Sequence, residues 1–124
     1  MLFRSYRDIY SNRLGGYLTY PIGPNFFRFK EWLVRTFTHQ EHFMVIELQG
    51  EPWASGWIAD IPLEEQFRTM DENKLRANVK YAQQVGFHDI YLWGGEWWYW
   101  MKTKKGYPAV WDAGKELFER YGEK

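Results

Sequence analysis

The sequence contains no cysteine, so neither disulfide bonds nor thiolate metal ligands can contribute to the fold. It has no excess charge of either sign, because 16 lysine and arginine residues balance 16 aspartate and glutamate residues. A chain without net charge lacks the field that attracts nucleic acids, so we expect no nucleic-acid partner. Its apolar runs are much shorter than the roughly 20 residues that cross a bilayer, and we expect no membrane span.

Histidine is also scarce. The three histidines, His39, His42 and His88, lack the close spacing of metal ligands, and we expect no metal site. The segment "GGYLTYPIG" lacks the order of a phosphate-binding glycine loop, and no serine or cysteine nucleophile elbow occurs.

Aromatic residues are abundant, at 21% of the chain, with eight tryptophans, nine tyrosines and nine phenylalanines. Ordinary hydrophobic cores do not need so many indole rings, whereas flat rings beside polar groups suit sugar faces or protein partners. A chain of 124 residues can form one domain with a modest core and is too short for two.

Hydrophobic periodicity and turn residues predict alternating helices and strands. We expect the end of a helix within residues 2–13, a strand over Tyr17–Pro21, a helix over Phe26–Phe37, a strand over His42–Gln49, a helical turn after Pro62, a helix from a Thr69 and Glu72 capping box to Gly86, a strand over His88–Trp93 and a helix from Pro108 to Gly122. Strands that alternate with helices indicate right-handed crossovers and a parallel sheet. The expected fold class is therefore α/β, as a barrel or an open sheet.

Two segments rich in carboxylates and aromatic rings follow predicted strands. They are "ELQGEPW", which begins at Glu47, and "GGEWWYW", which begins at Gly94. Parallel α/β folds bind their ligands at the C-terminal ends of the strands, so we expect a site where these two segments meet.

The alternation of side chains along each strand indicates which residues share a face. If Ile46 and Leu48 face the covering helices, Glu47 points the opposite way. On the last strand, Ile90 would lie under the helices and Trp93 on the Glu47 side. A carboxylate and an indole would then share one cavity, which favours a functional role for Glu47 over that of a plain ion-paired strand end. Neighbouring tryptophans point in opposite directions, so some of them must be structural.

These residues lie in segments that resemble those of a known protein family. The segments "VIELQGEPW" and "IYLWGGEWWYW" resemble the seventh and eighth strands of cellulase-like glycoside hydrolases, which are retaining enzymes on a (β/α)8 barrel, and "GGYLTYP" is similar to the sixth strand. The resemblance implies that residues 1–124 form a single unit, the last three strand-helix units of such a barrel.

The resemblance also implies roles for individual residues. Glu47 would be the catalytic nucleophile, Trp93 would support the sugar at the reacting subsite, and Tyr20 would be a tyrosine near the nucleophile. The other substrate-binding candidates lie in the same matching segments: Gln49, Glu51, Trp53, Glu96, Trp97 and Trp98. The partner would be a carbohydrate substrate, and no cofactor is required.

A retaining mechanism needs two carboxyl groups about 5 to 5.5 Å apart. These barrels carry their acid/base glutamate on the fourth strand, and nothing that corresponds to strands one to five occurs here. We therefore expect the chain alone to be inactive, with the remainder of the barrel or other copies of the chain as partners. Alternatives are that Glu51 or Glu96 supplies the acid in an assembly, that the chain is a non-catalytic carbohydrate-binding module, or that it is an aromatic-rich interaction fragment.

Overall fold

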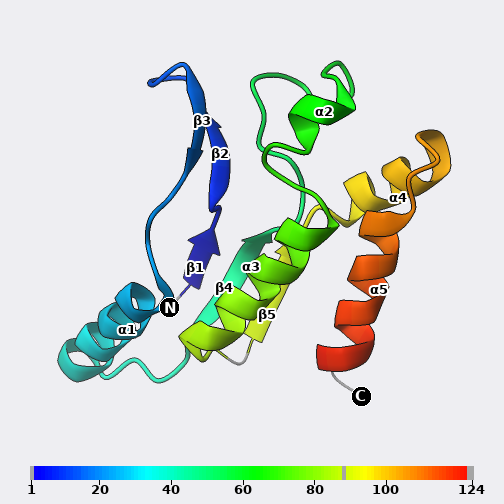
Figure 1. The fold of residues 1–124 in the computed structure, drawn as a ribbon. Helices are drawn as coiled ribbons and strands as arrows, with labels where there is room; N and C mark the ends of the chain where they lie inside the picture. Colours follow the sequence, from blue (N-terminus) through cyan, green and yellow to red (C-terminus); the bar gives the residue numbers. More distant parts are fainter. Residues whose placement is uncertain (1, 88, 123–124) are drawn as a thin grey trace.

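The structure is a computed structural model that describes residues 2–87 and 89–122 (Figure 1). Its strands are β1 (Leu2–Ser5), β2 (Asp8–Ser11), β3 (Gly16–Thr19), β4 (Met44–Gln49) and β5 (Asp89–Trp93). Its helices are α1 (Pro24–Thr38), α2 (Leu63–Gln66), α3 (Glu72–Val85), α4 (Gly95–Lys104) and α5 (Ala109–Tyr121). The predicted helices that correspond to α1, α2, α3 and α5 are confirmed, as are the strands β4 and β5, except that His88 lies outside the described residues.

The strands form two separate sheets. β1, β4 and β5 make a parallel sheet in the order β1-β4-β5, and β2 pairs with β3 as an antiparallel hairpin (Figure 1). The hairpin stands between the end of β1 and the start of α1. A mixed α/β fold with a three-stranded parallel sheet is therefore confirmed.

The N-terminal segment differs from the expected helix within residues 2–13, because it forms β1 and β2. Phe3 decides the structure here: the extended chain beside β4 buries its ring, which stacks on Phe87 with the ring centroids 4.9 Å apart. The predicted strand Tyr17–Pro21 overlaps β3, which belongs to the hairpin. The strand that precedes β4 in the parallel sheet is therefore β1.

Helices α1, α3 and α5 lie on one face of the parallel sheet (Figure 1). α3 packs on β4 and between the other two helices, and Leu75 and Leu117 are among the buried residues of this layer. Side chains on the opposite face of the sheet are open to solvent, since Leu2, Tyr91 and Trp93 are each more than half exposed. One face of the sheet is thus covered and the other is free.

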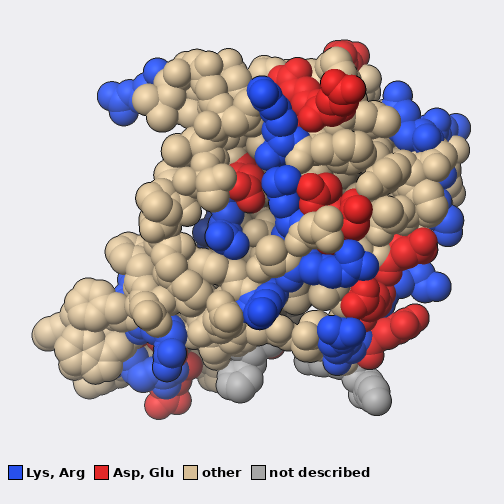
Figure 2. Space-filling model, in the orientation of Figure 1, with Lys and Arg blue, Asp and Glu red and all other residues tan. Residues whose placement is uncertain are grey.

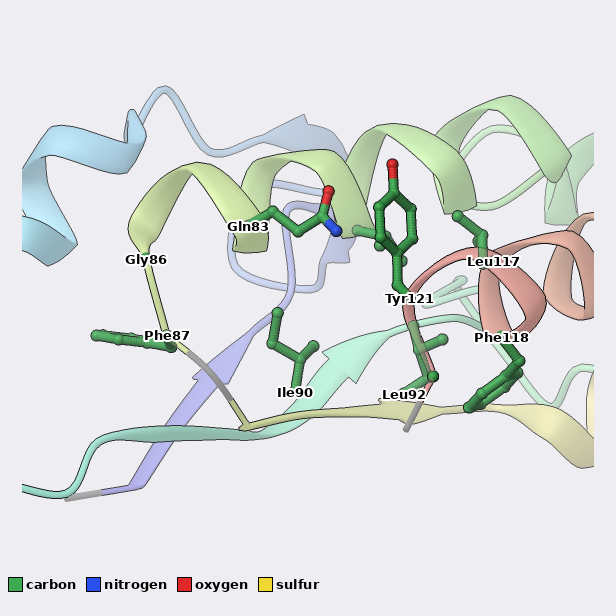
Figure 3. Close-up of a pocket in the computed structure, with 10 residues that line it drawn as sticks. Gln83, Gly86, Phe87, Ile90, Leu92, Leu117, Phe118 and Tyr121 are labelled. Atoms are coloured by element: carbon green, nitrogen blue, oxygen red, sulfur yellow. The ribbon is translucent and has the colours of Figure 1, made fainter. Parts of the chain in front are cut away.

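Strand β5 follows the predicted alternation. Ile90 and Leu92 point toward α3 and α5, where they line a hollow of about 380 Å³ together with Leu117 and Tyr121 (Figure 3). Tyr91 and Trp93 lie on the free face, as expected from their positions in the strand.

Strand β4 breaks the alternation with a bulge. Val45 pairs with Ile90 and Leu48 with Leu92, so two residues of β4 lie opposite the single residue Tyr91. Val45 therefore faces the helices, where it packs with residues of α1 and α3, and Leu48 is also buried. The expectation that Ile46 and Leu48 form the helix-facing pair is corrected to Val45 and Leu48.

Two further elements differ from the sequence-based expectation. The aromatic segment after Gly95 forms α4, with the side chains of Trp97 and Met101 buried. The N-cap of α3 is Asp71, whose carboxylate accepts the backbone N–H groups of residues 73 and 74, instead of Thr69. Thr69 is buried and accepts the backbone N–H of Trp53, so it tethers the loop after β4.

Candidate functional site

Glu47 lies near the C-terminal end of β4 and is held at both carboxylate oxygens. The Tyr6 hydroxyl donates to Oε2 at 2.9 Å, and Nε of Arg4 lies 3.1 Å from Oε1. The side chain of Glu47 is 20% exposed, so it is sheltered but still reachable from solvent. Because Arg4 pairs with Glu47 in the register of β1 and β4, the sheet itself brings these groups together.

The Glu47 carboxylate changes the chemistry of its tyrosine neighbour. Burial, the hydrogen bond to Glu47 and the negative charges of Glu47 and Glu51 together raise the pKa of Tyr6 to about 12. Tyr6 therefore stays a neutral hydrogen-bond donor at physiological pH. It is suited to holding the orientation of a carboxylate that reacts or binds at this place.

Glu51 and Trp93 form a second pair at the same edge of the sheet. The indole Nε1 of Trp93 donates to Oε1 of Glu51 at 3.0 Å. Burial raises the pKa of Glu51, the bond from Trp93 lowers it, and the nearby charge of Glu96 raises it, with a net upward shift. Trp93 is 52% exposed, so the hydrogen bond fixes a ring that remains open to a ligand.

Two glycines allow the ends of β4 and β5 to approach this closely. The backbone N–H of Gly50 donates to the carbonyl of Trp93 at 2.8 Å, and a Cβ on Gly50 would lie 2.6 Å from that oxygen. A Cβ on Gly94 would lie 2.6 Å from Cβ of Glu51, and Gly94 has a φ of 120°, which side-chain-bearing residues rarely adopt. The Glu51 and Trp93 pair thus depends on glycine at both positions.

Trp53 completes the exposed aromatic part of this site. Its ring meets that of Tyr6 edge to face, with the centroids 4.9 Å apart, and it is 48% exposed. Its backbone is tied at both ends, because its N–H donates to Thr69 and its carbonyl accepts the N–H of Tyr10. The loop after β4 is therefore held against the β2–β3 hairpin.

Gln49 lies beneath this surface and is fully buried. Its Oε1 accepts the backbone N–H groups of Arg7 and Asp8 at 3.0 and 3.1 Å, and its Nε2 donates to the carbonyl of Asp8 at 2.6 Å. These bonds occupy the amide on both sides. The geometry gives Gln49 a structural role, which is to fix the start of the hairpin to the end of β4.

Trp97 and Trp98 are also buried. Nε1 of Trp97 donates to Gln66 at 2.8 Å, and Nε1 of Trp98 donates to the carbonyl of Gly50 at 2.6 Å. Both rings pack within the protein. Glu96 is exposed on the first turn of α4.

Tyr20 is exposed after β3, and among the described residues no hydrogen bond joins it to Glu47. It shares a hollow of about 180 Å³ with Tyr6 and Arg4. The tyrosine that contacts Glu47 is Tyr6.

The structure brings together four of the residues singled out from the sequence: Glu47, Glu51, Trp53 and Trp93. Arg4 and Tyr6 belong to the same cluster and were missed, because the segment around them was expected to be helical. The burial of Phe3 between exposed Leu2 and Arg4 is that of a strand, but the sequence "LFRSY" has no apolar and polar alternation that would have indicated it.

Comparison with protein-family models, with curated proteins and with solved structures found no match. Within residues 2–87 and 89–122, no group of three or more histidine, aspartate or glutamate side chains could hold a metal ion. None of the described helices is both long enough and apolar enough to span a membrane.

Proposed function

We propose that this chain supplies the nucleophile of a retaining β-glycosidase built on a (β/α)8 barrel. The observation that carries the proposal is the position of Glu47, near the end of a parallel strand, with Arg4 and Tyr6 holding its two oxygens. The ends of barrel strands are where such enzymes place their catalytic groups. Trp93, at the end of the next strand, offers a half-exposed ring on which a sugar can stack.

The arrangement of the sheet supports the barrel part of the proposal. The strand order follows the chain, and α1, α3 and α5 all lie on the same face (Figure 1). Consecutive units of a barrel are arranged in this way, whereas a doubly wound sheet has helices on both faces.

The edge strands of the parallel sheet and the exposed surface of α1 support the proposal that further strand-helix units complete the barrel. Among residues 2–87 and 89–122, no further strand pairs with the outer edge of β1 or of β5. The outer surface of α1 exposes four aromatic side chains, Phe26, Phe29, Trp32 and Phe37. Further strand-helix units, or another copy of the chain, would cover these surfaces.

In the proposed reaction, the Glu47 carboxylate attacks the anomeric carbon as the bond to the leaving oxygen breaks. That oxygen takes a proton from a second carboxylic acid. In the second step, water attacks the anomeric carbon of the glycosyl ester and gives a proton to the same acid group, which releases the Glu47 carboxylate. Arg4 and Tyr6 orient the attacking carboxylate. We assign the acid to the units that complete the barrel, because Glu51 is engaged by Trp93.

A mechanism-based label tests the nucleophile without requiring the acid. 2,4-Dinitrophenyl 2-deoxy-2-fluoro-β-glucoside and the matching cellobioside have leaving groups that depart without protonation. We expect one fluoroglycosyl group per chain, mapped to Glu47 by mass spectrometry. Glu47→Gln should remain unlabelled, and Glu41→Gln, at an exposed loop position, should react like the parent chain. Labelling at a different carboxylate would contradict the assignment.

The exposed rings of Trp53 and Trp93 favour a second candidate, a non-catalytic carbohydrate-binding module. Titration with cello-oligosaccharides, followed by tryptophan fluorescence, tests it. Trp93→Ala should weaken binding by about tenfold, and Trp57→Ala, at an exposed loop position, should not. Binding without labelling would favour the binding module. If neither labelling nor binding were observed, the aromatic-rich interaction fragment would be the favoured alternative.

A further inference from the structure

Among the described residues, the lining of a recess beside β1 includes basic side chains and no carboxylate. Its main hollow, of about 560 Å³, lies between the exit of the β2–β3 hairpin, the start of α1 and α3, and is lined in part by Arg7, Tyr20, Lys80 and Tyr81. The smaller hollow that contains Arg4 shares Arg7, Tyr20 and Tyr81 with it. Figure 2 shows basic atoms at the bottom of a recess between the hairpin and α1.

Arg7 is held in place by the surrounding structure. Its backbone N–H donates to Gln49, and its carbonyl accepts the backbone N–H of Tyr20 at 2.8 Å. Its guanidinium lies over the ring of Tyr81, 4.5 Å from the centroid, and the Tyr81 hydroxyl is itself fixed by a bond to the carbonyl of Ile22. The guanidinium is therefore oriented before any ligand arrives.

Within the part of the chain that the structure describes, the guanidinium nevertheless has no hydrogen-bonding partner. Nε of Arg7 is buried without an acceptor, and among the described residues its side chain makes no ion pair or hydrogen bond. A buried donor on a charged group costs free energy when it is left unpaired. Its terminal nitrogens also make no hydrogen bond among the described residues and remain accessible, so an anion in the hollow would give the guanidinium an acceptor at these atoms.

The surroundings add positive potential to the recess. Lys80, from α3, is exposed and also makes no ion pair among the described residues. α1 begins in the same hollow, with no side-chain cap and no acidic residue in its first turn. Of the carboxylates bonded to lining residues, Glu47 is paired with Arg4, whereas Asp8 accepts only the neutral Thr19 hydroxyl and keeps its negative charge at the edge of the recess.

We propose that this recess binds an oxyanion, the sulfate, phosphate or carboxylate group of a ligand, between Arg7 and Lys80. The planar guanidinium can donate two parallel hydrogen bonds to such a group. The hollow is larger than a bare anion, and Tyr20, which is 42% exposed, provides a ring against which a sugar that carries the anion can lie. This site is separate from the Glu47 carboxylate and does not depend on the proposed hydrolase.

Isothermal titration calorimetry on the full chain tests the site, with sodium sulfate, glucose 6-sulfate and glucose compared at constant ionic strength. We expect saturable binding of one sulfate per chain, tighter binding of glucose 6-sulfate and weaker or no binding of glucose. Arg7→Gln should weaken sulfate binding by about tenfold or more, because it removes the charged donors. Lys80→Gln should have a smaller effect, because Lys80 is well solvated.

Matched variants separate the site from general charge effects. Arg68→Gln removes an arginine that also stacks on a tyrosine, Tyr17 at 5.0 Å, and should bind sulfate like the parent chain. Arg7→Lys should retain part of the affinity. Unsaturable sulfate binding, or equal affinity in folded Arg7→Gln and the parent chain, would overturn the proposal. Equal affinities for sulfate and glucose 6-sulfate would support a free anion as the ligand.

Discussion

The hydroxyl of Tyr6 donates to the Glu47 carboxylate at 2.9 Å, although 41 positions separate the two residues in the chain. The contact forms because β1 and β4 are parallel neighbours, so Tyr6 just beyond β1 reaches the end of β4. Burial, this bond and the neighbouring negative charge raise the pKa of Tyr6 to about 12. The pairing of β1 with β4 thus produces the contact that contributes to the raised pKa of Tyr6.

The raised pKa of Tyr6 predicts a loss of stability at high pH. A group whose pKa is higher in the folded state stabilises the fold below its unfolded pKa, here 10.0, and loses that contribution as pH rises through its folded pKa of about 12. Urea unfolding between pH 9 and 12 should therefore show a steeper decline for the parent chain than for Tyr6→Phe. Tyr99→Phe, at an exposed position, should decline like the parent chain. Identical slopes in all three proteins would exclude the Glu47 contact.

Gly94 and Gly95 are adjacent but should respond in opposite ways to alanine. A Cβ on Gly94 would collide with Glu51, and its φ of 120° is strained for alanine, so Gly94→Ala should destabilise by about 3 kcal/mol. A Cβ on Gly95 meets nothing within 4 Å at the start of α4, so Gly95→Ala should be neutral or stabilise by about 0.5 kcal/mol. Urea unfolding of both variants measures the difference. Equal stabilities would mean that the ends of β4 and β5 do not approach as described.

Gln49 should behave as a structural residue. Gln49→Met keeps the volume but leaves the partly buried backbone N–H groups of Arg7 and Asp8 without their acceptor, and we expect a destabilisation of about 2 kcal/mol. Hydrogen exchange at these two amides should also speed up. Gln84→Met, exposed on α3, is the control and should change little. An unchanged stability in Gln49→Met would instead favour the substrate-binding role implied by the family resemblance.

The sequence predicts the elements whose local pattern agrees with their tertiary environment. The helical stripe that includes Leu75 and Val79 lies in the core, and β5 alternates as expected between Ile90 under the helices and Trp93 on the free face. The sequence alone therefore places Glu47 and Trp93 at the same end of the sheet. The barrel, the catalytic role and the sugar remain predictions.

Elsewhere, tertiary contacts outweigh local spacing. Tyr6, Ile9 and Tyr10 have helical spacing, but burial of Phe3 against Phe87 makes the segment extended, which hides Arg4 and Tyr6 from a local analysis. The bulge in β4 depends on its pairing with both neighbouring strands and leaves no local pattern in the sequence. The helix α4 is similarly obscured, because its aromatic residues are distributed around the helix instead of along one stripe.

Glu51 provides a pH-dependent test of the pair that it forms with Trp93. Its raised pKa means that its contribution to stability is present below its unfolded pKa, near 4.5, and is lost as pH rises through the higher folded value. Glu51→Gln cannot ionise and can still accept the indole N–H, so its stability relative to the parent chain should increase from pH 4 to pH 7. Urea unfolding at both pH values measures this change, with Glu41→Gln as an exposed control that should show none. If the relative stability of Glu51→Gln fell over the same interval, the carboxylate would be stabilised in its ionised form, and Glu51 would become a candidate for binding a cationic group.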